Sequence, residues 1–150
     1  MELYIQEEQI SVHLQKRLER FRADYPVADE VKRRVSKPDM PFFGKEILEM
    51  AVSALLECEN ILLCGDKATG KNILAENLAW MFGRPVYNMS FHVNTDSGSL
   101  IGSDTFVDNE VKLRKGPVYQ CAAYGGFGIL DEINMAKNDA VSVLHATLDY

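Results

Sequence analysis

The sequence is poor in cysteine and contains no long apolar run. Its three cysteines, Cys58, Cys64 and Cys121, are an odd number without a CxxC pair, so neither a disulfide framework nor a zinc site is indicated. We expect reduced, mostly buried thiols. No segment approaches the roughly 18 consecutive apolar residues of a membrane helix, and the N-terminus lacks the basic and apolar regions of a signal peptide. These absences predict a soluble, cytoplasmic protein with no membrane partner.

An excess of basic charge is also absent. The chain has 16 Lys and Arg against 22 Asp and Glu, a formal net charge of -6, whereas nucleic-acid-binding proteins concentrate basic residues on one face. The short cluster Lys32-Arg33-Arg34 is flanked by acids, and we interpret it as a solvated surface. With 150 residues, 47% hydrophobic and 25% charged, the composition is that of one globular domain and excludes disordered, collagenous and coiled-coil classes.

The chain divides into an N-terminal segment and a core. Apolar residues recur at helical spacing from Ile10 to Phe21, up to the break at Tyr25-Pro26, and predict a surface-docked helix. A proline-containing linker follows, after which the chain becomes more apolar. We therefore expect a helical segment with its linker at residues 1–39 and a core domain at residues 40–150.

Helices and short apolar strands alternate in the core, which is the pattern of a parallel α/β sheet. The strand expected at 61–64 is apolar throughout, as a strand covered on both faces would be. A hairpin is expected at about 105–113, turning at Asp108-Asn109. The other expected strands are 86–91 and 127–130, and the expected helices are about 47–56, 71–82, 117–125 and a last one around 141–148.

A glycine-rich loop lies between the strand expected at 61–64 and the helix expected at 71–82. It fits the pattern G-x-x-x-x-G-K at every fixed position, and Asn stands where the pattern ends in Ser or Thr. Glycines let backbone N–H groups converge, the helix N-terminus adds positive potential, and the lysine adds a cation. We interpret the loop as a polyphosphate cradle rather than a chance turn. Its residues are Gly65, Asp66, Lys67, Ala68, Thr69, Gly70, Lys71 and Asn72, followed by Ile73.

A second candidate site follows the apolar strand expected at 127–130, which ends in two adjacent acids. Asp131 is placed to hold Mg²⁺, and Glu132 to polarise an attacking water. An Asp-Glu pair alone is more typical of an exposed turn, but after a buried strand and together with a phosphate loop it predicts catalysis. We expect Lys71 and Glu132 as catalytic residues, and Asn72 and Asp131 as metal ligands.

Four segments together resemble the AAA+ ATPases, and within them the MoxR-like branch. The loop at 65–72 and the segment Gly128–Asn134 are shared by many P-loop proteins, whereas the segments 94–102 and 114–119, in that order and spacing, point to the branch. The resemblance covers about residues 40–150. It implies a three-layer α/β P-loop fold with a parallel sheet, in which the hairpin is inserted in the second core helix.

The resemblance also implies what such a protein does. It would bind ATP with Mg²⁺ and hydrolyse it to drive remodelling or activation of a protein partner, often one with a von Willebrand A domain. The active form would be a homo-oligomeric ring, commonly a hexamer. Phe43 and Gly44, with the neighbouring Phe42, would lie beside the adenine.

The sequence departs from the family pattern in two places. Asn72 stands where the family has Ser or Thr; an amide carbonyl is also an oxygen donor but has a different reach, which predicts weakened metal binding or slow hydrolysis. The chain also stops before the sensor strand, arginine finger and lid, so we expect a truncated core. Two alternatives stay open: a nucleotide-dependent binding module with little or no hydrolysis, and a GTP-driven motor of the restriction-enzyme type.

Overall fold

The computed structural model describes residues 10–107 and 110–148. The chain forms two compact units, one extending to Pro85 and the other beginning at Val86. Each unit has its own helices and its own buried residues, and the phosphate loop belongs to the first unit.

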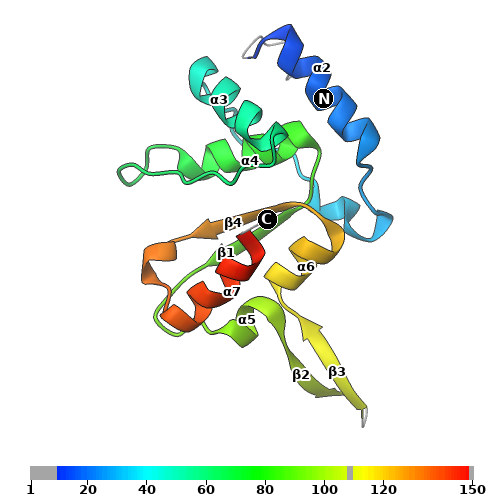
Figure 1. The fold of residues 1–150 in the computed structure, drawn as a ribbon, viewed down its shortest axis with the longest axis vertical. Coiled ribbons are helices and arrows are strands. Elements are labelled where there is room, and N and C mark those ends of the chain that lie inside the picture. The colour runs from blue at the N-terminus through cyan, green and yellow to red at the C-terminus, as the bar shows by residue number, and fades with distance from the viewer. Residues whose placement is uncertain (1–9, 108–109, 149–150) are drawn as a thin grey trace. The chain divides into compact units, whose positions relative to one another are not determined.

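The first unit is helical. Helices α2 (Val12–Asp24), α3 (Lys45–Leu56) and α4 (Lys71–Phe82) pack against one another, and the short 3-10 helix η1 (Asp29–Arg34) follows α2 (Figure 1). The helix expected in the N-terminal segment is thereby confirmed. Each of the three helices buries one apolar face, with the side chains of Leu14, Leu18, Leu48, Val52, Leu74, Leu78 and Phe82 at its centre.

Helix α2 is tied to the end of α4 by specific contacts. The rings of Phe21 and Phe82 meet edge to face with centroids 5.1 Å apart, a favourable aromatic geometry. Arg22 Nη1 donates to the carbonyl oxygen of Met81 at 3.0 Å, where the last carbonyls of a helix lack partners within the helix. The N-terminal segment is therefore part of the same packed unit as the helix that follows the phosphate loop.

Helix α4 has the bounds that the sequence predicted. Gly70 precedes it with φ 86° and Gly83 follows it with φ 63°, both in the left-handed region that glycine enters without steric cost. These two glycines end the helix on both sides. The expected helix at 71–82 is confirmed.

The expected strand at 61–64 is wrong. The structure has no strand among residues 57–66, and the side chain of Leu62 is 77% exposed. A short apolar run forms a strand only where another strand pairs with it. No strand lies among the described residues of this unit, so the run has no pairing partner there. The helix before it, α3, buries Leu48 and Val52 but leaves Ile47 about half exposed.

The second unit is built on a two-stranded parallel sheet. Strand β1 (Val86–Ser90) pairs with β4 (Phe127–Asp131), Val86 opposite Phe127 and Ser90 opposite Asp131. Helices α5 (Ser97–Ile101), α6 (Pro117–Tyr124) and α7 (Asn138–Leu148), with the short 3-10 helix η2 (Ile133–Met135), complete this α/β unit (Figure 1). The sheet and the three helices share one core, formed by Tyr87, Met89, Phe91, Leu100, Val118, Ala140 and Leu144.

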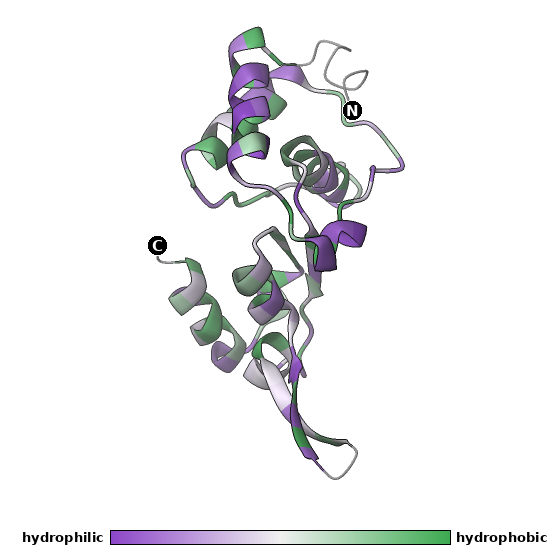
Figure 2. Ribbon diagram, turned by 90° about the vertical axis from the view of Figure 1, so that its right-hand side faces the viewer, coloured by the Kyte–Doolittle hydropathy of each residue, from purple (hydrophilic) through white to green (hydrophobic). Residues whose placement is uncertain are grey.

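The predicted hairpin is confirmed and is longer than expected. Strands β2 (Gly102–Val107) and β3 (Glu110–Lys115) pair antiparallel, and Figure 1 shows them extending away from β1 and β4 of the same unit. Its expected turn at Asp108-Asn109 lies outside the described residues. Hydrophobic and hydrophilic residues are mixed along the two strands (Figure 2), and Phe106 at their far end is 71% exposed.

The cysteines are less buried than the sequence predicted. All three are free thiols, but Cys58 and Cys64 are exposed and only Cys121 is partly buried. Cys58 follows the end of α3 with φ 63°, and Cys64 lies in the segment that did not form a strand, so neither has a sheet or helix face to pack under. Among the described residues, no helix is long and apolar enough to cross a membrane.

Candidate functional site

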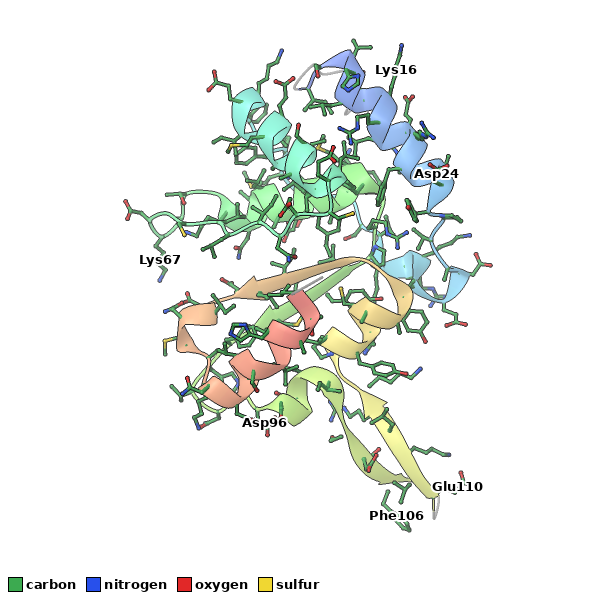
Figure 3. All side chains as sticks on the ribbon, in the orientation of Figure 1. Lys16, Asp24, Lys67, Asp96, Phe106 and Glu110 are labelled. Atoms are coloured by element: carbon green, nitrogen blue, oxygen red, sulfur yellow. The ribbon has the colours of Figure 1, made fainter. Side chains whose placement is uncertain are left out.

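The glycine-rich loop predicted to bind phosphate closes on itself just before helix α4. The hydroxyl of Thr69 donates to the carbonyl oxygen of Asp66 at 2.9 Å, which folds the loop into a turn. Ala68 and Gly70 both have positive φ, 64° and 86°, and such left-handed residues turn successive backbone N–H groups toward one side of a loop. Lys67 lies at the tip of this loop (Figure 3).

Lys71 lies against the loop that it follows. Its Nζ donates to the carbonyl oxygens of Gly65 at 3.0 Å and Asp66 at 2.7 Å, with the hydroxyl of Thr69 at 3.5 Å. The ammonium group is thus held within the turn by neutral oxygen atoms. Negatively charged phosphate oxygens are stronger partners for an ammonium than carbonyls are, so this cation is placed where a polyphosphate can recruit it.

The N-terminus of α4 carries no competing negative charge. The N-cap residue is Gly70, no side chain caps the helix, and the first turn holds no acid. The first N–H groups of the helix have no partner within it and carry its positive end. Asn72 is exposed and Ile73 partly buried in this first turn, so the helix end can bind an anion.

An aromatic segment lies beside the loop in the same unit. A Cβ built on Gly44 would lie 2.9 Å from Phe42 Cε1, and one built on Gly70 would lie 3.9 Å from Phe42 Cε2. The ring of Phe42 therefore lies between the start of α3 and the start of α4. The ring of Phe43 is 75% exposed. Of the residues expected beside adenine, Phe42 rather than Phe43 lies next to the loop.

Sequence analysis missed one polar residue of this region, Asn77. Its side chain is fully buried in α4, at 0% exposure, and bonds to the backbone of Met40, Phe42 and Ile73. The signal was present in the sequence: Asn77 is a polar residue within the apolar stripe of the helix predicted at 71–82, three positions after Leu74 and four before Met81.

The two predicted acids lie in the second unit, at the carboxyl end of β4. The backbone N–H of Glu132 donates to Asp131 Oδ1 at 3.0 Å, and the carbonyl oxygen of Asp131 accepts from Phe91 N at 2.9 Å. Both acids are exposed. Glu132 has φ 55°, a left-handed conformation that is uncommon outside glycine and found at functional sites. In open parallel α/β sheets, ligands bind at this end of the strands.

The structure joins the two other sequence segments of interest, 94–102 and 114–119, at the base of the hairpin. Gly116 N donates to the carbonyl oxygen of Ile101 at 2.8 Å. Within the first segment, Asp96 caps α5: its carboxylate accepts from Ser99 N at 2.7 Å while Ser99 Oγ accepts from Asp96 N at 3.3 Å. The bond from the Ser99 backbone, together with the Ser99 side chain, lowers the pKa of Asp96 below its usual value.

The two halves of the predicted site belong to different units. Lys71 and Asn72 lie in the first unit, Asp131 and Glu132 in the second. Among the described residues, no three His, Cys, Asp or Glu side chains gather into a self-sufficient metal site. Within the second unit, the exposed carboxylates of Asp131 and Glu132 are of the kind that Mg²⁺ takes as ligands, usually one or two carboxylates together with phosphate oxygens of the substrate.

Comparison with known families gives one match. The family described as AAA domain (dynein-related subfamily) matches residues 60–150, a stretch that contains the phosphate loop, the hairpin and the two acids. This match and the α/β architecture of the second unit confirm the expected fold class, a partial P-loop NTPase domain of the AAA type.

Curated relatives were found in Bacillus and Staphylococcus. An uncharacterized protein of Bacillus subtilis named YojN is 31% identical over 132 residues, which are 85% of this chain and 43% of that protein. Uncharacterized proteins of Staphylococcus saprophyticus and Staphylococcus epidermidis are 37% and 36% identical over 97 residues, which are 61% of this chain and 37% of each relative. The chain therefore spans about two fifths of the length of these relatives.

Proposed function

The chain belongs to the AAA family, and on that premise we propose that it is part of an ATPase that binds ATP with Mg²⁺ and hydrolyses it to remodel or activate a protein partner. The observation that carries the proposal is the loop at 65–70 running into the uncapped N-terminus of α4. A polyphosphate site needs converging backbone N–H groups, a cation and a helix N-terminus. This loop provides left-handed residues, a lysine and a first helical turn without acids.

Each predicted site residue has a role in this proposal. The backbone of residues 68–72 would cradle the phosphates, and Lys71 would exchange its loop carbonyls for phosphate oxygens. Asn72 and Asp131 would hold the metal, which neutralises charge on the phosphates when bound. Glu132 would accept the proton of the attacking water.

We propose further that the protein belongs to the MoxR-like branch and works in the cytoplasm as a homo-oligomeric ring, commonly a hexamer. Support for the branch comes from the segments 94–102 and 114–119, which meet at the base of the hairpin through Gly116 and Ile101. Its protein client would be one with a von Willebrand A domain. Free, partly exposed thiols fit a reducing compartment.

A second candidate is a nucleotide-dependent binding module that hydrolyses slowly or not at all. The observation that favours it is Asn72, an exposed amide in the first turn of α4, where a hydroxyl would ligate Mg²⁺ directly. In this case the bound nucleotide would organise an interface rather than drive a motor.

The experiment is a titration of the chain with a fluorescent ATP analogue, with and without Mg²⁺. We expect Lys71→Ala to weaken binding by about tenfold to a hundredfold, because a hydrogen bond to a charged group contributes about 1.5–3 kcal/mol. Lys16→Ala, which removes an exposed lysine of α2 (Figure 3), is the matched control and should bind like the wild type.

The outcomes test the phosphate cradle and the preference for a base. Binding that is lost in Lys71→Ala and kept in Lys16→Ala supports the phosphate cradle. Equal binding by all three proteins contradicts it. Competition by unlabelled ATP and GTP then tests the base: stronger competition by GTP would favour the GTP-driven motor.

A further inference from the structure

Asn77 is the only fully buried polar side chain among those described in the first unit. It lies in helix α4, on the face that packs against the rest of the unit. Its Nδ2 donates to the carbonyl oxygens of Met40 at 2.9 Å and Ile73 at 2.7 Å, and its Oδ1 accepts from Phe42 N at 3.3 Å. A buried amide is therefore satisfied by three bonds to backbone groups.

Two of the three bonds leave the helix. The bond to Ile73 lies within α4, but those to Met40 and Phe42 reach a segment more than thirty positions earlier in the chain. The Asn77 amide N–H donates to the carbonyl of Met40, and the Asn77 amide oxygen accepts from the N–H of Phe42. Among uncharged side chains of this size, only an amide has two N–H donors and a carbonyl acceptor, so Asp cannot donate to Met40 and Leu can do neither.

These bonds hold an aromatic segment against the phosphate loop. Asn77 fixes the backbone on both sides of Pro41, and the ring that follows, that of Phe42, lies beside Gly44 and Gly70. Asn77 is also on the helix that begins with Lys71, about 9 Å further along its axis at about 1.5 Å per residue. One rigid helix thus carries both the phosphate-binding lysine and the anchor of the aromatic segment.

We propose that Asn77 is a positioning residue for the base of the nucleotide. It holds residues 40–44 at the edge of the phosphate loop, so that this segment forms the wall against which the purine packs. Phe42 contributes the ring closest to the loop and Phe43 an exposed ring beside it; aromatic faces are suited to bases because every base has a π-face. This inference rests on the function proposed above.

The competing explanation is that Asn77 only stabilises the unit. The two explanations differ in which part of the ligand they affect. Loss of stability would weaken the binding of any ligand of the loop, whereas a displaced aromatic segment would weaken only ligands that carry a base. Inorganic tripolyphosphate has the phosphates of ATP without the base, and it separates the two.

The experiment is calorimetric titration of the full chain with ATP and with tripolyphosphate, at the same excess of Mg²⁺. In Asn77→Leu, which keeps the volume and loses both bonds to the segment, we expect ATP affinity to fall about tenfold, the equivalent of one or two hydrogen bonds. Tripolyphosphate affinity should stay within about twofold of the wild type, because the loop and Lys71 are unchanged.

The matched control is Leu78→Ala, which removes a buried side chain from the same helix, 3% exposed, and keeps Asn77 with its bonds to Met40 and Phe42. Both ligands should bind to it with an unchanged ratio of affinities. If circular dichroism shows that Asn77→Leu does not fold, Phe42→Leu replaces it: this variant keeps the backbone bonds to Asn77 and removes the ring. It too should lose ATP affinity selectively.

The outcomes are distinct. A selective loss for ATP supports the positioning role. Equal losses for both ligands in Asn77→Leu, or unchanged ATP affinity in Phe42→Leu, overturn that role while ATP binding stands. If the wild-type chain binds tripolyphosphate as tightly as ATP, the positioning role is overturned as well. A wild-type chain that binds neither ligand overturns the proposed function, and this inference with it.

Discussion

Ala68 and Glu132 adopt left-handed backbone conformations, with φ of 64° and 55°, although neither is glycine. Such a conformation costs a residue with a Cβ about 1–2 kcal/mol, and it persists where the surrounding structure holds the backbone. One of these residues lies in the phosphate loop and the other at the end of β4. Both halves of the candidate site therefore contain a backbone turn that local preference alone would not select.

Asn72 decides between the two candidate functions. If its amide is a poor metal ligand, Asn72→Thr should lower the Mg²⁺ concentration needed for half-maximal nucleotide binding by roughly tenfold, because a hydroxyl restores direct ligation. The measurement is nucleotide binding as a function of Mg²⁺ concentration. Asn72→Ala is the comparison, and an equal Mg²⁺ requirement in all three proteins would mean that residue 72 does not contact the metal.

Asp96 makes stability depend on pH. Its carboxylate accepts from the Ser99 backbone N–H, and this bond, together with the nearby Ser99 side chain, holds its pKa below its usual value of about 3.8. A lowered pKa stabilises the fold above the pKa of the unfolded chain, and this contribution disappears as pH falls through the folded pKa. Asp96→Ala should therefore lower Tm at about pH 7 and make a much smaller difference at about pH 3.

The control for this comparison is Asp104→Ala, at an exposed acid of the hairpin that caps no helix. Its Tm should follow the wild-type value at both pH values. The Tm difference between Asp96→Ala and the wild type should shrink in acid. If it is as large in acid as at neutral pH, the cap acts through something other than the carboxylate charge.

The hairpin element is built around a close approach at its base. The N–H of Gly116 bonds to Ile101, and a Cβ at position 116 would collide with the carbonyl of Leu100. The backbone at this position has an ordinary φ of -77°, which any residue can adopt. Glycine is therefore required only by the lack of space for a Cβ. The position where β3 leads into α6 is therefore one of the tightest in the second unit, although β3 itself is exposed along its length.

Gly116→Ala should destabilise the second unit by about 1–3 kcal/mol, as overpacking does. Gly98→Ala is the matched control. Its Cβ would lie 3.7 Å from Asp96 Oδ1, an ordinary van der Waals distance, and alanine favours a helix over glycine, so stability should change by at most about 1 kcal/mol. Chemical denaturation of the three proteins is the measurement. Equal stability of both variants would contradict the close packing at the base of the hairpin.

The molecule as a whole has two cores. Leu18 is buried in the first unit and Leu144 in the second. We expect the two units to respond separately to core substitutions. Leu144→Ala should lower the free energy of unfolding of the second unit by about 2–5 kcal/mol. It should reduce amide protection in the helices and strands of that unit, while α2, α3 and α4 keep their protection. Leu18→Ala should do the reverse, and hydrogen exchange is the measurement. Loss of protection in both units from either substitution would show a single cooperative structure.

Much of the fold follows from local patterns. The bounds of α4 are predictable because Gly70 and Gly83 flank an apolar stripe. The strand at 127–131 is predictable because a short apolar run follows two glycines, and the strand at 86–90 because apolar and polar residues alternate there. Asn77 was not predictable as an anchor, because its partners Met40 and Phe42 lie 37 and 35 positions away. Hydrogen bonds of that range depend on how α4 packs, which periodicity does not reveal.

Residues adjacent along the chain are enough to predict a phosphate loop and an acid pair, because the predicted chemistry depends on short spacing: a glycine-rich turn, a lysine and a helix start. Folding settles matters that spacing leaves open. Of three apolar runs expected as strands, β1 and β4 pair while 61–64 does not, and Phe42 rather than Phe43 packs beside Gly70. The physical reason is that a strand or a buried ring is stabilised by neighbours from distant parts of the chain, and those neighbours exist only once the chain has folded.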